Sequence, residues 1–175
     1  MGIEIRPAEI DDIPAIADVL SQAARHKSEK GDYLWGDQPY TTDEVGQMLE
    51  SGGLYAVTAD GTVTGTVRIT DSDERVWGDD GTSSEALYVH GLATSDTVRG
   101  QNVGGKVLEW VAEKAKQEGK KAVRLDCSYT NRGLCNYYVQ RGFAEIKRRD
   151  IPRKSTARDL RDPVYQAALL QRTVI

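Results

Sequence analysis

The sequence predicts an α/β protein in which helices pack on one mixed β-sheet. Segments with strand-like alternation and segments with helical spacing of apolar residues follow one another along the chain. No repeat, low-complexity tract or linker divides the 175 residues, so we expect a single domain over residues 1–175 with its core at 3–172. Hydrophobic residues make up 39% and charged residues 29%, a balance typical of a globular protein.

The N-terminal part of the chain is predicted to form a strand and two helices. Residues 3–7 alternate apolar and polar and end at a proline. Apolar residues at helical spacing then indicate an amphipathic helix, and His26 near its end is interpreted as a surface residue. Residues 31–40 form an aromatic-rich loop, after which Thr41 and Glu44 make the capping-box pattern that starts a second helix.

The middle of the chain is β-rich. Residues 54–59 and 62–69 are joined by an Asp-Gly pair, the two-residue signature of a tight hairpin turn. Residues 70–83 are interpreted as a loop and 86–94 as another strand. This part of the chain therefore supplies strands to the predicted sheet.

The C-terminal part begins with the strongest helical signal. Residues 103–118 carry one apolar face, and Gly119 is placed to end the helix. The elements predicted after it are a strand at 122–128, a helix at 133–140, a strand at 144–149, a charged loop at 151–162 and a last strand at 164–172.

Composition and charge exclude several classes of function. A net charge of −4 and a pI near 5.3 argue against a nucleic-acid partner, which needs concentrated positive charge. No apolar stretch approaches the roughly 20 residues of a membrane span, and the N-terminus does not look like a secretory signal, so we expect a cytoplasmic protein without a membrane partner. Cys127 and Cys135 lack metal-ligand spacing, which predicts reduced thiols and no metal site.

The most informative segment is the turn at residues 95–106, Ser-Asp-Thr-Val-Arg-Gly-Gln-Asn-Val-Gly-Gly-Lys. It leads from a strand into a helix, where the first amides have no internal partners and glycines allow a phosphate to approach closely. Arg99 and Lys106 add positive charge. The alternative is a helix start that is only glycine-rich. A Walker motif is excluded because Val107 stands where a magnesium-binding hydroxyl is needed, and GxGxxG is absent, so a nucleotide hydrolase is disfavoured.

Three segments together resemble the GNAT superfamily of N-acetyltransferases. Residues 99–104 resemble its motif A, Arg/Gln-x-x-Gly-x-Gly/Ala, with Asn102 in place of the first motif glycine. Asparagine is the non-glycine residue that best tolerates left-handed backbone angles, so the turn can survive. Residues 131–143 look like Asn-x-x-Ala-x-x-x-Tyr-x-x-x-Gly-Phe with Leu134 replacing alanine, and residues 87–94 are similar to the strand before motif A.

This resemblance implies a GNAT fold with acetyl-CoA as co-substrate. The sheet would be twisted, mostly antiparallel, with about six or seven strands splayed in the middle and about four flanking helices. The pantetheine arm would pair with the backbone of Leu92 and Thr94, with Gly91 easing a bulge and Asn131 on the other side. The residues expected to bind the cofactor are Leu92, Ala93, Thr94, Arg99, Gly100, Gln101, Asn102, Val103, Gly104, Gly105, Asn131, Leu134 and Tyr138.

The resemblance and the chemistry of acetyl transfer together suggest catalytic roles. The Leu92 backbone N–H would stabilise the oxyanion. Tyr138 matches the family's general acid, whereas Tyr137 falls one position off the motif and is expected to point elsewhere. His90 is the candidate base, placed by strand alternation on the same face as Leu92. Glu85 or a chain of waters is the alternative base.

The acceptor is expected to be a small amine, and a cationic amine would suit the residues described next. In the family, loops corresponding to residues 32–40 and 71–80 build the acceptor pocket, and both mix acids with aromatic residues. The side chains expected to line it are Tyr33, Trp35, Trp77 and Tyr88. Polyamines, amino acids, aminoglycosides, aryl amines and peptide N-termini stay open, as does the choice between a monomer and a homodimer. An inactive acetyl-CoA sensor on the same fold is the alternative function.

Overall fold

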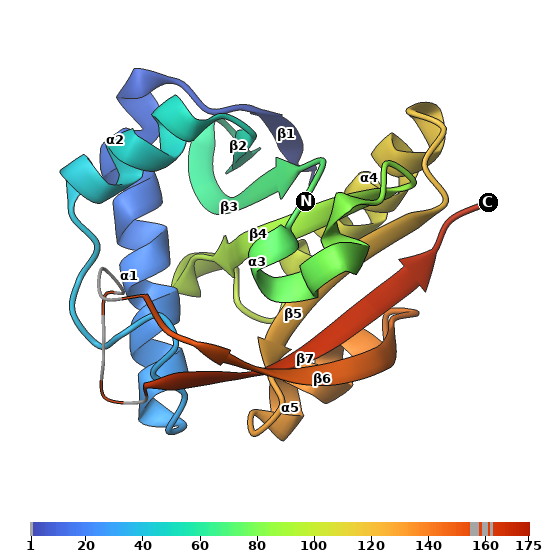
Figure 1. Cartoon of the computed structure of the whole chain (residues 1–175). Coiled ribbons are helices and arrows are strands. Elements are labelled where there is room, and N and C mark those ends of the chain that lie inside the picture. The colour runs from blue at the N-terminus through green and yellow to red at the C-terminus, as the bar shows by residue number, and fades with distance from the viewer. Residues whose placement is uncertain (1, 155–157, 159–160, 162) are drawn as a thin grey trace.

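A computed structural model describes residues 2–154, 158, 161 and 163–175. Its strands form one seven-stranded sheet in the order β1-β2-β3-β4-β5-β7-β6 (Figure 1). All neighbours are antiparallel except β4 and β5, which run parallel. The expected mixed, mostly antiparallel sheet is therefore confirmed. The strands are β1 (Glu4–Pro7), β2 (Leu54–Ala59), β3 (Thr62–Thr70), β4 (Ala86–Thr94), β5 (Ala122–Ser128), β6 (Ala144–Pro152) and β7 (Val164–Thr173).

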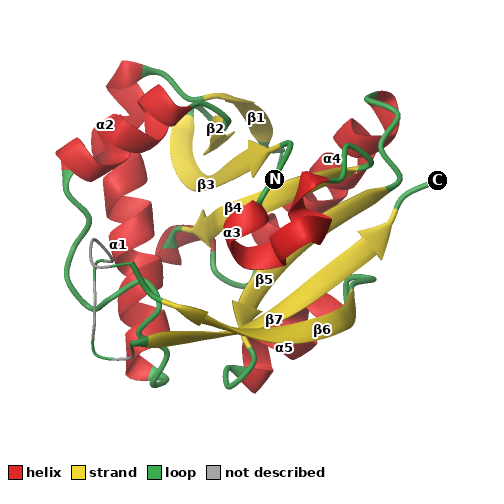
Figure 2. Ribbon diagram, viewed as in Figure 1, coloured by secondary structure: helices red, strands yellow, loops and turns green. Residues whose placement is uncertain are grey.

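Helices cover both faces of this sheet (Figure 2). On one face, α4 and α5 enclose a core with Val107, Val111 and Leu125. On the other face, α1 and α2 cover the β1–β4 half, while α3 lies over the rest. No helix within the described residues is long and apolar enough to cross a membrane. The helices are α1 (Ile13–Glu29), α2 (Thr42–Ser51), α3 (Glu74–Trp77), α4 (Val103–Gln117) and α5 (Arg132–Val139), with 3-10 turns at 10–12, 78–82 and 96–98.

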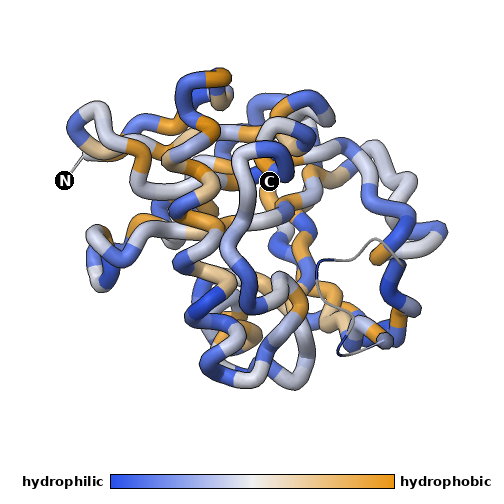
Figure 3. Tube along the Cα trace, turned by 90° about the vertical axis from the view of Figure 1, so that its left-hand side faces the viewer, coloured by the Kyte–Doolittle hydropathy of each residue, from blue (hydrophilic) through white to orange (hydrophobic). Residues whose placement is uncertain are grey.

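Local signals in the sequence are borne out at several boundaries. Thr41 and Glu44 form the reciprocal capping box at the start of α2. The hairpin between β2 and β3 turns at Asp60 and Gly61, with φ of 51° and 79°, the left-handed angles that such a turn requires. Hydrophilic residues lie mainly at the outer turns and hydrophobic segments run between them (Figure 3).

Two expectations about loops need correction. Residues 70–83 were expected to lack regular structure, but they contain α3, whose N-terminus is capped by Asp73 Oδ1 accepting from the Val76 N–H at 3.3 Å. A helix this short is below the length at which periodicity can be detected. The charged loop expected at 151–162 begins later, because Ile151 pairs with Tyr165 and extends β6 to Pro152. Part of that loop lies outside the described residues.

The sheet opens between its two parallel strands. β4 and β5 are paired only where residues 86–88 face 122–124, and beyond that point the two strands diverge (Figure 2). The edge of β4 that faces the gap therefore has backbone groups without a neighbouring strand. This is the splay that the resemblance implied.

A bulge in β4 decides which side chains face each side of the sheet. Gly91 has φ +58°, and the pairing with β3 shifts at this point. Tyr88 belongs to the core on the α3 face, and Leu92 packs against the core on the α4 face. His90 keeps the side of Tyr88, because the extra residue lies after it. The expectation that His90 and Leu92 share a face is therefore wrong.

Candidate active site

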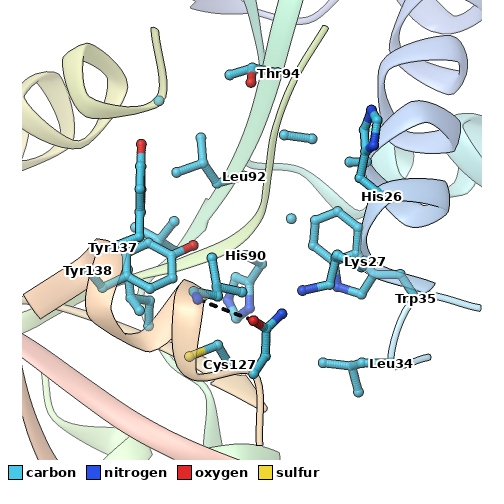
Figure 4. Close-up of a pocket in the computed structure, with 18 of the residues that line it drawn as sticks. His26, Lys27, Leu34, Trp35, His90, Leu92, Thr94, Cys127, Tyr137 and Tyr138 are labelled. Atoms are coloured by element: carbon cyan, nitrogen blue, oxygen red, sulfur yellow. Dashed lines mark hydrogen bonds between the residues drawn. The ribbon is translucent and has the colours of Figure 1, made fainter. Parts of the chain in front are cut away.

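A cavity of about 1050 Å³ fills the opening between β4 and β5. Its wall is built from the end of β4, the middle of β5, the start of α4, and α5; α1 and the loop after it close the opposite side (Figure 4). Tyr137 and Tyr138 stand on one side, with Lys27 and Trp35 across from them. The cavity reaches both faces of the sheet, because residues of the α4 face and of the α3 face line it.

The turn before α4 forms one end of this cavity. Asn102 adopts the left-handed conformation with φ 56° and ψ 32°, as the sequence predicted for the residue that replaces the motif glycine. The amides at the start of α4 point out of the helix end, because the first turn has no internal acceptors for them. Arg99, Gly100, Asn102, Val103 and Gly104 line the cavity, whereas Gln101 and Gly105 do not.

Two glycines of α4 leave space that neighbouring side chains occupy. A Cβ at Gly105 would lie 2.2 Å from Asn102 Oδ1, and one at Gly104 would lie 2.5 Å from the Tyr137 hydroxyl. Both distances are shorter than real Cβ contacts. The glycine pair thus makes room for the two side chains that shape the turn.

Arg141 is a functional candidate that sequence reasoning missed. Its Nη2 donates to Asn102 Oδ1 at 3.1 Å, and its guanidinium carbon lies 3.5 Å from the centre of the Tyr137 ring. It also lines the cavity, so it brings a positive charge to the turn before α4. The signal available was its position four residues after an aromatic residue, a spacing typical of cation–π contacts on helices.

Arg99, the first motif residue, is held by a polar cluster at the cavity mouth. Arg99 Nη2 and Asp96 Oδ1 lie 2.5 and 2.6 Å from His26 Nε2, and Arg99 Nη2 is 3.2 Å from Asp96 Oδ1. His26 is partly exposed, as expected, but it also lines the cavity. The cluster orients Arg99 while partly neutralising its charge.

Tyr138 lines the cavity from α5 and is buried, with 8% of its surface exposed. Its ring packs edge-on against Phe143 at 5.9 Å. Burial raises the pKa of the Tyr138 phenol, which keeps the hydroxyl protonated. Tyr137 was expected to point elsewhere, but it lines the same cavity and directs its hydroxyl to the start of α4 (Figure 4).

His90 lines the cavity from the α3 face of the sheet. Its Nε2 lies 2.8 Å from Thr70 Oγ1. Burial lowers the pKa of His90, and the nearby Arg68 lowers it further, while the charge of Asp73 acts in the opposite direction. The imidazole is therefore neutral at pH 7 and able to accept a proton. Glu85, the reserve candidate, is exposed in an ion pair with Lys121 at 2.6 Å and does not line the cavity.

Asp126 is the second candidate that the sequence did not reveal. It lines the cavity from the middle of β5, where its Oδ2 accepts from the Tyr165 hydroxyl at 2.5 Å. Burial raises the pKa of Asp126 to about 6, with Asp73 contributing in the same direction. The only signal was a carboxylate between apolar neighbours in a predicted strand, which does not separate a cavity-facing residue from a solvated one.

Asn131 is tied to the protein at both ends of its amide. Its Oδ1 caps α5 by accepting from the Leu134 N–H at 3.2 Å, and its Nδ2 donates to Asp32 Oδ2 at 3.0 Å. Asp32 also pairs with Lys27 at 3.1 Å, and these contacts help keep the pKa of Asp32 low despite its burial. Asp32 thus connects Asn131, at the start of α5, with Lys27 in α1. Leu134, Ala93 and Thr94 lie in the cavity wall as well.

The acceptor pocket expected from two aromatic loops is only partly present. Trp77 and Tyr88 are each 1% exposed and do not line the cavity. They pack edge-on against each other on the α3 face with Arg124 4.6 Å above the Trp77 ring, because a short helix folds that loop onto the sheet. Tyr33 also lies outside, covered by Arg161 at 3.8 Å. Trp35 alone of the four lines the cavity.

The two cysteines lie beside the cavity and are free, as predicted, with their sulfur atoms 3.3 Å apart. Burial raises the pKa of Cys127 above its ordinary value, so this thiol is a poor nucleophile. Within the described residues no group of three or more His, Cys, Asp or Glu side chains could hold a metal ion.

The splayed sheet, the glycine-rich helix start and Tyr138 meet at one cavity, and comparison with known families identifies the family to which this arrangement belongs. The profile of the Acetyltransferase (GNAT) family matches residues 18–143. This chain therefore belongs to the GNAT family of acetyltransferases.

Individual proteins are similar to this chain in sequence or in fold. The chain is 27% identical over 148 residues to the uncharacterized N-acetyltransferase YesJ of Bacillus subtilis (strain 168), covering 81% of this chain and 82% of that one. A GNAT-family acetyltransferase from Listeria monocytogenes has the same fold with a TM-score of 0.73 at 21% identity, covering 98% and 94%. The fold of yncA from Salmonella typhimurium, solved with its cofactor acetyl-CoA, matches with a TM-score of 0.70 at 17% identity, covering 100% and 95%.

Proposed function

We infer that this protein transfers the acetyl group of acetyl-CoA to the amine of a small acceptor, by direct attack within a ternary complex. The observation that carries this function is a single cavity that joins the start of α4, the open edge of β4 and the hydroxyl of Tyr138. Membership of the GNAT family and the acetyl-CoA held by the Salmonella neighbour support it.

The residues at one end of the cavity fit acetyl-CoA. The unpaired edge of β4 offers backbone donors and acceptors to an extended pantetheine arm. The amides at the start of α4, with Arg99 and Arg141 beside them, suit a pyrophosphate. A Cβ built at Gly91 or Gly100 meets nothing within 4 Å, so the backbone is open to a ligand there.

Three groups of the chain can serve the transfer. Acetyl-CoA supplies a thioester whose carbonyl carbon forms a bond to the acceptor nitrogen as its bond to sulfur breaks. The Leu92 N–H, on the open part of β4, would donate to the carbonyl oxygen as negative charge develops on it. The Tyr138 hydroxyl would give its proton to the leaving sulfur. His90, neutral at pH 7, would take the proton from the acceptor amine directly or through water.

The acid role is tested by following free CoA thiol with acetyl-CoA and a broad panel of amines. No described group hydrogen-bonds the Tyr138 hydroxyl, so Tyr138→Phe removes the proton donor while leaving no buried partner unpaired. We expect kcat to fall by about a hundredfold, the lower end of what a general acid contributes. Tyr129→Phe, outside the cavity, is the matched control.

Three outcomes are informative. A loss of kcat confined to Tyr138→Phe supports Tyr138 as the general acid. A larger loss of kcat in Tyr137→Phe would instead assign that role to Tyr137. If acetyl-CoA raises the melting temperature but no amine releases thiol, the protein is an acetyl-CoA sensor and not an enzyme. Absence of acetyl-CoA binding would overturn the cofactor assignment itself.

A further inference from the structure

Three arginines on the α3 face of the sheet give the acceptor side of the cavity a positive wall. Arg68, Arg75 and Arg153 all line the cavity. Arg68 lies on β3 directly opposite His90 in the pairing with β4, and the charge of Arg75 acts on Asp126. These cations therefore lie around the groups that would meet the acceptor amine.

Within the part of the chain that the structure describes, no carboxylate forms an ion pair with any of these three. Arg68 Nε donates to the Gly52 carbonyl at 3.1 Å, and Arg153 Nη2 donates to the Leu34 carbonyl at 3.0 Å. The neighbouring Arg158 differs, since it pairs with Glu44 at 2.7 Å. Among the described residues, the three guanidinium groups of the cavity lining are thus not held in direct ion pairs.

Carboxylates stand among them at the gap. Asp126 is held by Tyr165, and Asp73 is close enough for its charge to act on both Asp126 and His90. The wall therefore presents negative charge near the candidate base and positive charge around it. A ligand that carries only positive charge would be repelled by the arginines, and one that carries only negative charge would be repelled by the acids.

The phosphates of CoA do not account for these arginines. The start of α4, with Arg99 and Arg141, lies on the α4 face of the sheet, whereas Arg68 and Arg75 are on the α3 face. The cofactor would therefore leave the positive wall free for the second ligand.

Building on the acetyl transfer inferred above, we propose that the acceptor is an amino acid, whose amine faces Asp126 and His90 and whose carboxylate binds Arg75 and Arg153. Arginine suits this role because its planar guanidinium can bind both oxygens of a carboxylate. This proposal adds recognition of a negative group to the acids and aromatic residues that the sequence predicted for the acceptor pocket.

The thiol-release assay tests this proposal. Each of the protein amino acids is compared as acceptor with its carboxamide and with its decarboxylated amine, and spermidine is tested as a further acceptor. The amides keep the amine and side chain and lose only the negative charge. We expect the best amino acid to have a kcat/KM at least about tenfold above that of its amide, because a charge-assisted pair is lost.

A variant of Arg75 separates recognition from folding. Arg75 is exposed, so Arg75→Gln leaves no buried group unpaired, and Arg153→Gln serves as a second variant. Each should raise KM for the amino acid about tenfold while changing KM for its amide, and for acetyl-CoA, less than about twofold. Arg148→Gln is the matched control, because it removes an exposed pair with Glu145 and a contact with the Tyr129 ring, both outside the cavity.

The outcomes distinguish this inference from the function on which it rests. The acceptor assignment fails if spermidine or the neutral amides are acetylated with a kcat/KM equal to that of the amino acids. It also fails if Arg75→Gln and Arg153→Gln raise KM for the amino acid and for its amide equally. In either case the proposed acetyl transfer stands. If acetyl-CoA binds but no compound releases thiol, the proposed transfer fails and the acceptor assignment fails with it.

Discussion

Arg141 and Asn102, which lie 39 residues apart in the chain, are joined at the α4 end of the cavity by a hydrogen bond of 3.1 Å from the guanidinium to the asparagine side chain. The motif glycine that Asn102 replaces has no side chain and could not form this bond. Asn102 therefore supplies the left-handed turn and also anchors a positive charge beside it.

Removing that charge should weaken cofactor binding. Arg141→Gln deletes a cation next to the amides of α4, and we expect KM for acetyl-CoA to rise about five- to tenfold, equivalent to about 1 kcal/mol, with little change in kcat. The rise should shrink as ionic strength increases, because salt screens a partly exposed charge. Steady-state kinetics at two salt concentrations checks this, with Arg148→Gln as control. An unchanged KM would exclude Arg141 from the phosphate site.

The backbone angle at Asn102 should dominate the stability effect of replacing it. Asn102→Ala keeps a Cβ at the left-handed angle but removes the polar side chain that makes asparagine tolerant of it, and should lower the free energy of unfolding by about 1–2 kcal/mol. Asn102→Gly fits the angle of +56° and should stay within about 0.5 kcal/mol of the natural protein. Urea unfolding measures both. Equal losses in the two variants would mean that the bond to Arg141, and not the angle, stabilises the turn.

Gly104 and Tyr137 should be energetically coupled. A methyl group at residue 104 would meet the Tyr137 hydroxyl at 2.5 Å but the ring carbon that bears it only at 3.6 Å. Gly104→Ala should therefore be neutral or destabilising alone, whereas in a Tyr137→Phe background it should stabilise by about 1 kcal/mol, the helix preference of alanine over glycine. A double-mutant cycle in urea gives the coupling. Additive effects would show that the hydroxyl is not the obstacle.

Asp126→Asn should stabilise the ligand-free protein in a pH-dependent way. The pKa of Asp126 is about 6 in the folded protein against an ordinary value of 3.8, so the folded state holds this proton more tightly. The associated stability is present below pH 4 and lost as pH rises through 6. At pH 8 the free energy of unfolding of Asp126→Asn should therefore exceed that of the natural protein by up to about 3 kcal/mol. At pH 4 the two values should be nearly equal.

Melting temperatures of the two proteins at pH 4, 6 and 8 check this dependence. The same variant should lose activity toward the acceptor, because the negative charge that faces the amine is gone. An equal stabilisation at all three pH values would show that burial does not destabilise the charged form of Asp126. Asp150→Asn, on β6 outside the large cavity, is the control for a general effect of charge.

Patterns within short segments determined much about this protein. The periodicity of residues 103–118 located α4, and the Asp60-Gly61 pair located a hairpin. The spacing from Asn131 to Phe143 singled out Tyr138, which lines the cavity. The left-handed conformation of Asn102 followed from its residue type and from its place at a glycine position of the motif. Such features depend on interactions between residues near one another in the chain, so the local sequence is enough to predict them.

Only the tertiary structure decided how those segments combine. The bulge at Gly91 placed His90 and Leu92 on opposite faces, and α3 folded Trp77 into the core and away from the cavity. Asp126 meets Tyr165 because β5 and β7 are neighbours in the sheet, an order that no local pattern encodes. The charges that line the proposed acceptor site come from β3, α3, β5 and the chain after β6. Their juxtaposition is set by strand order and packing, since contacts between distant segments exist only once the sheet has formed.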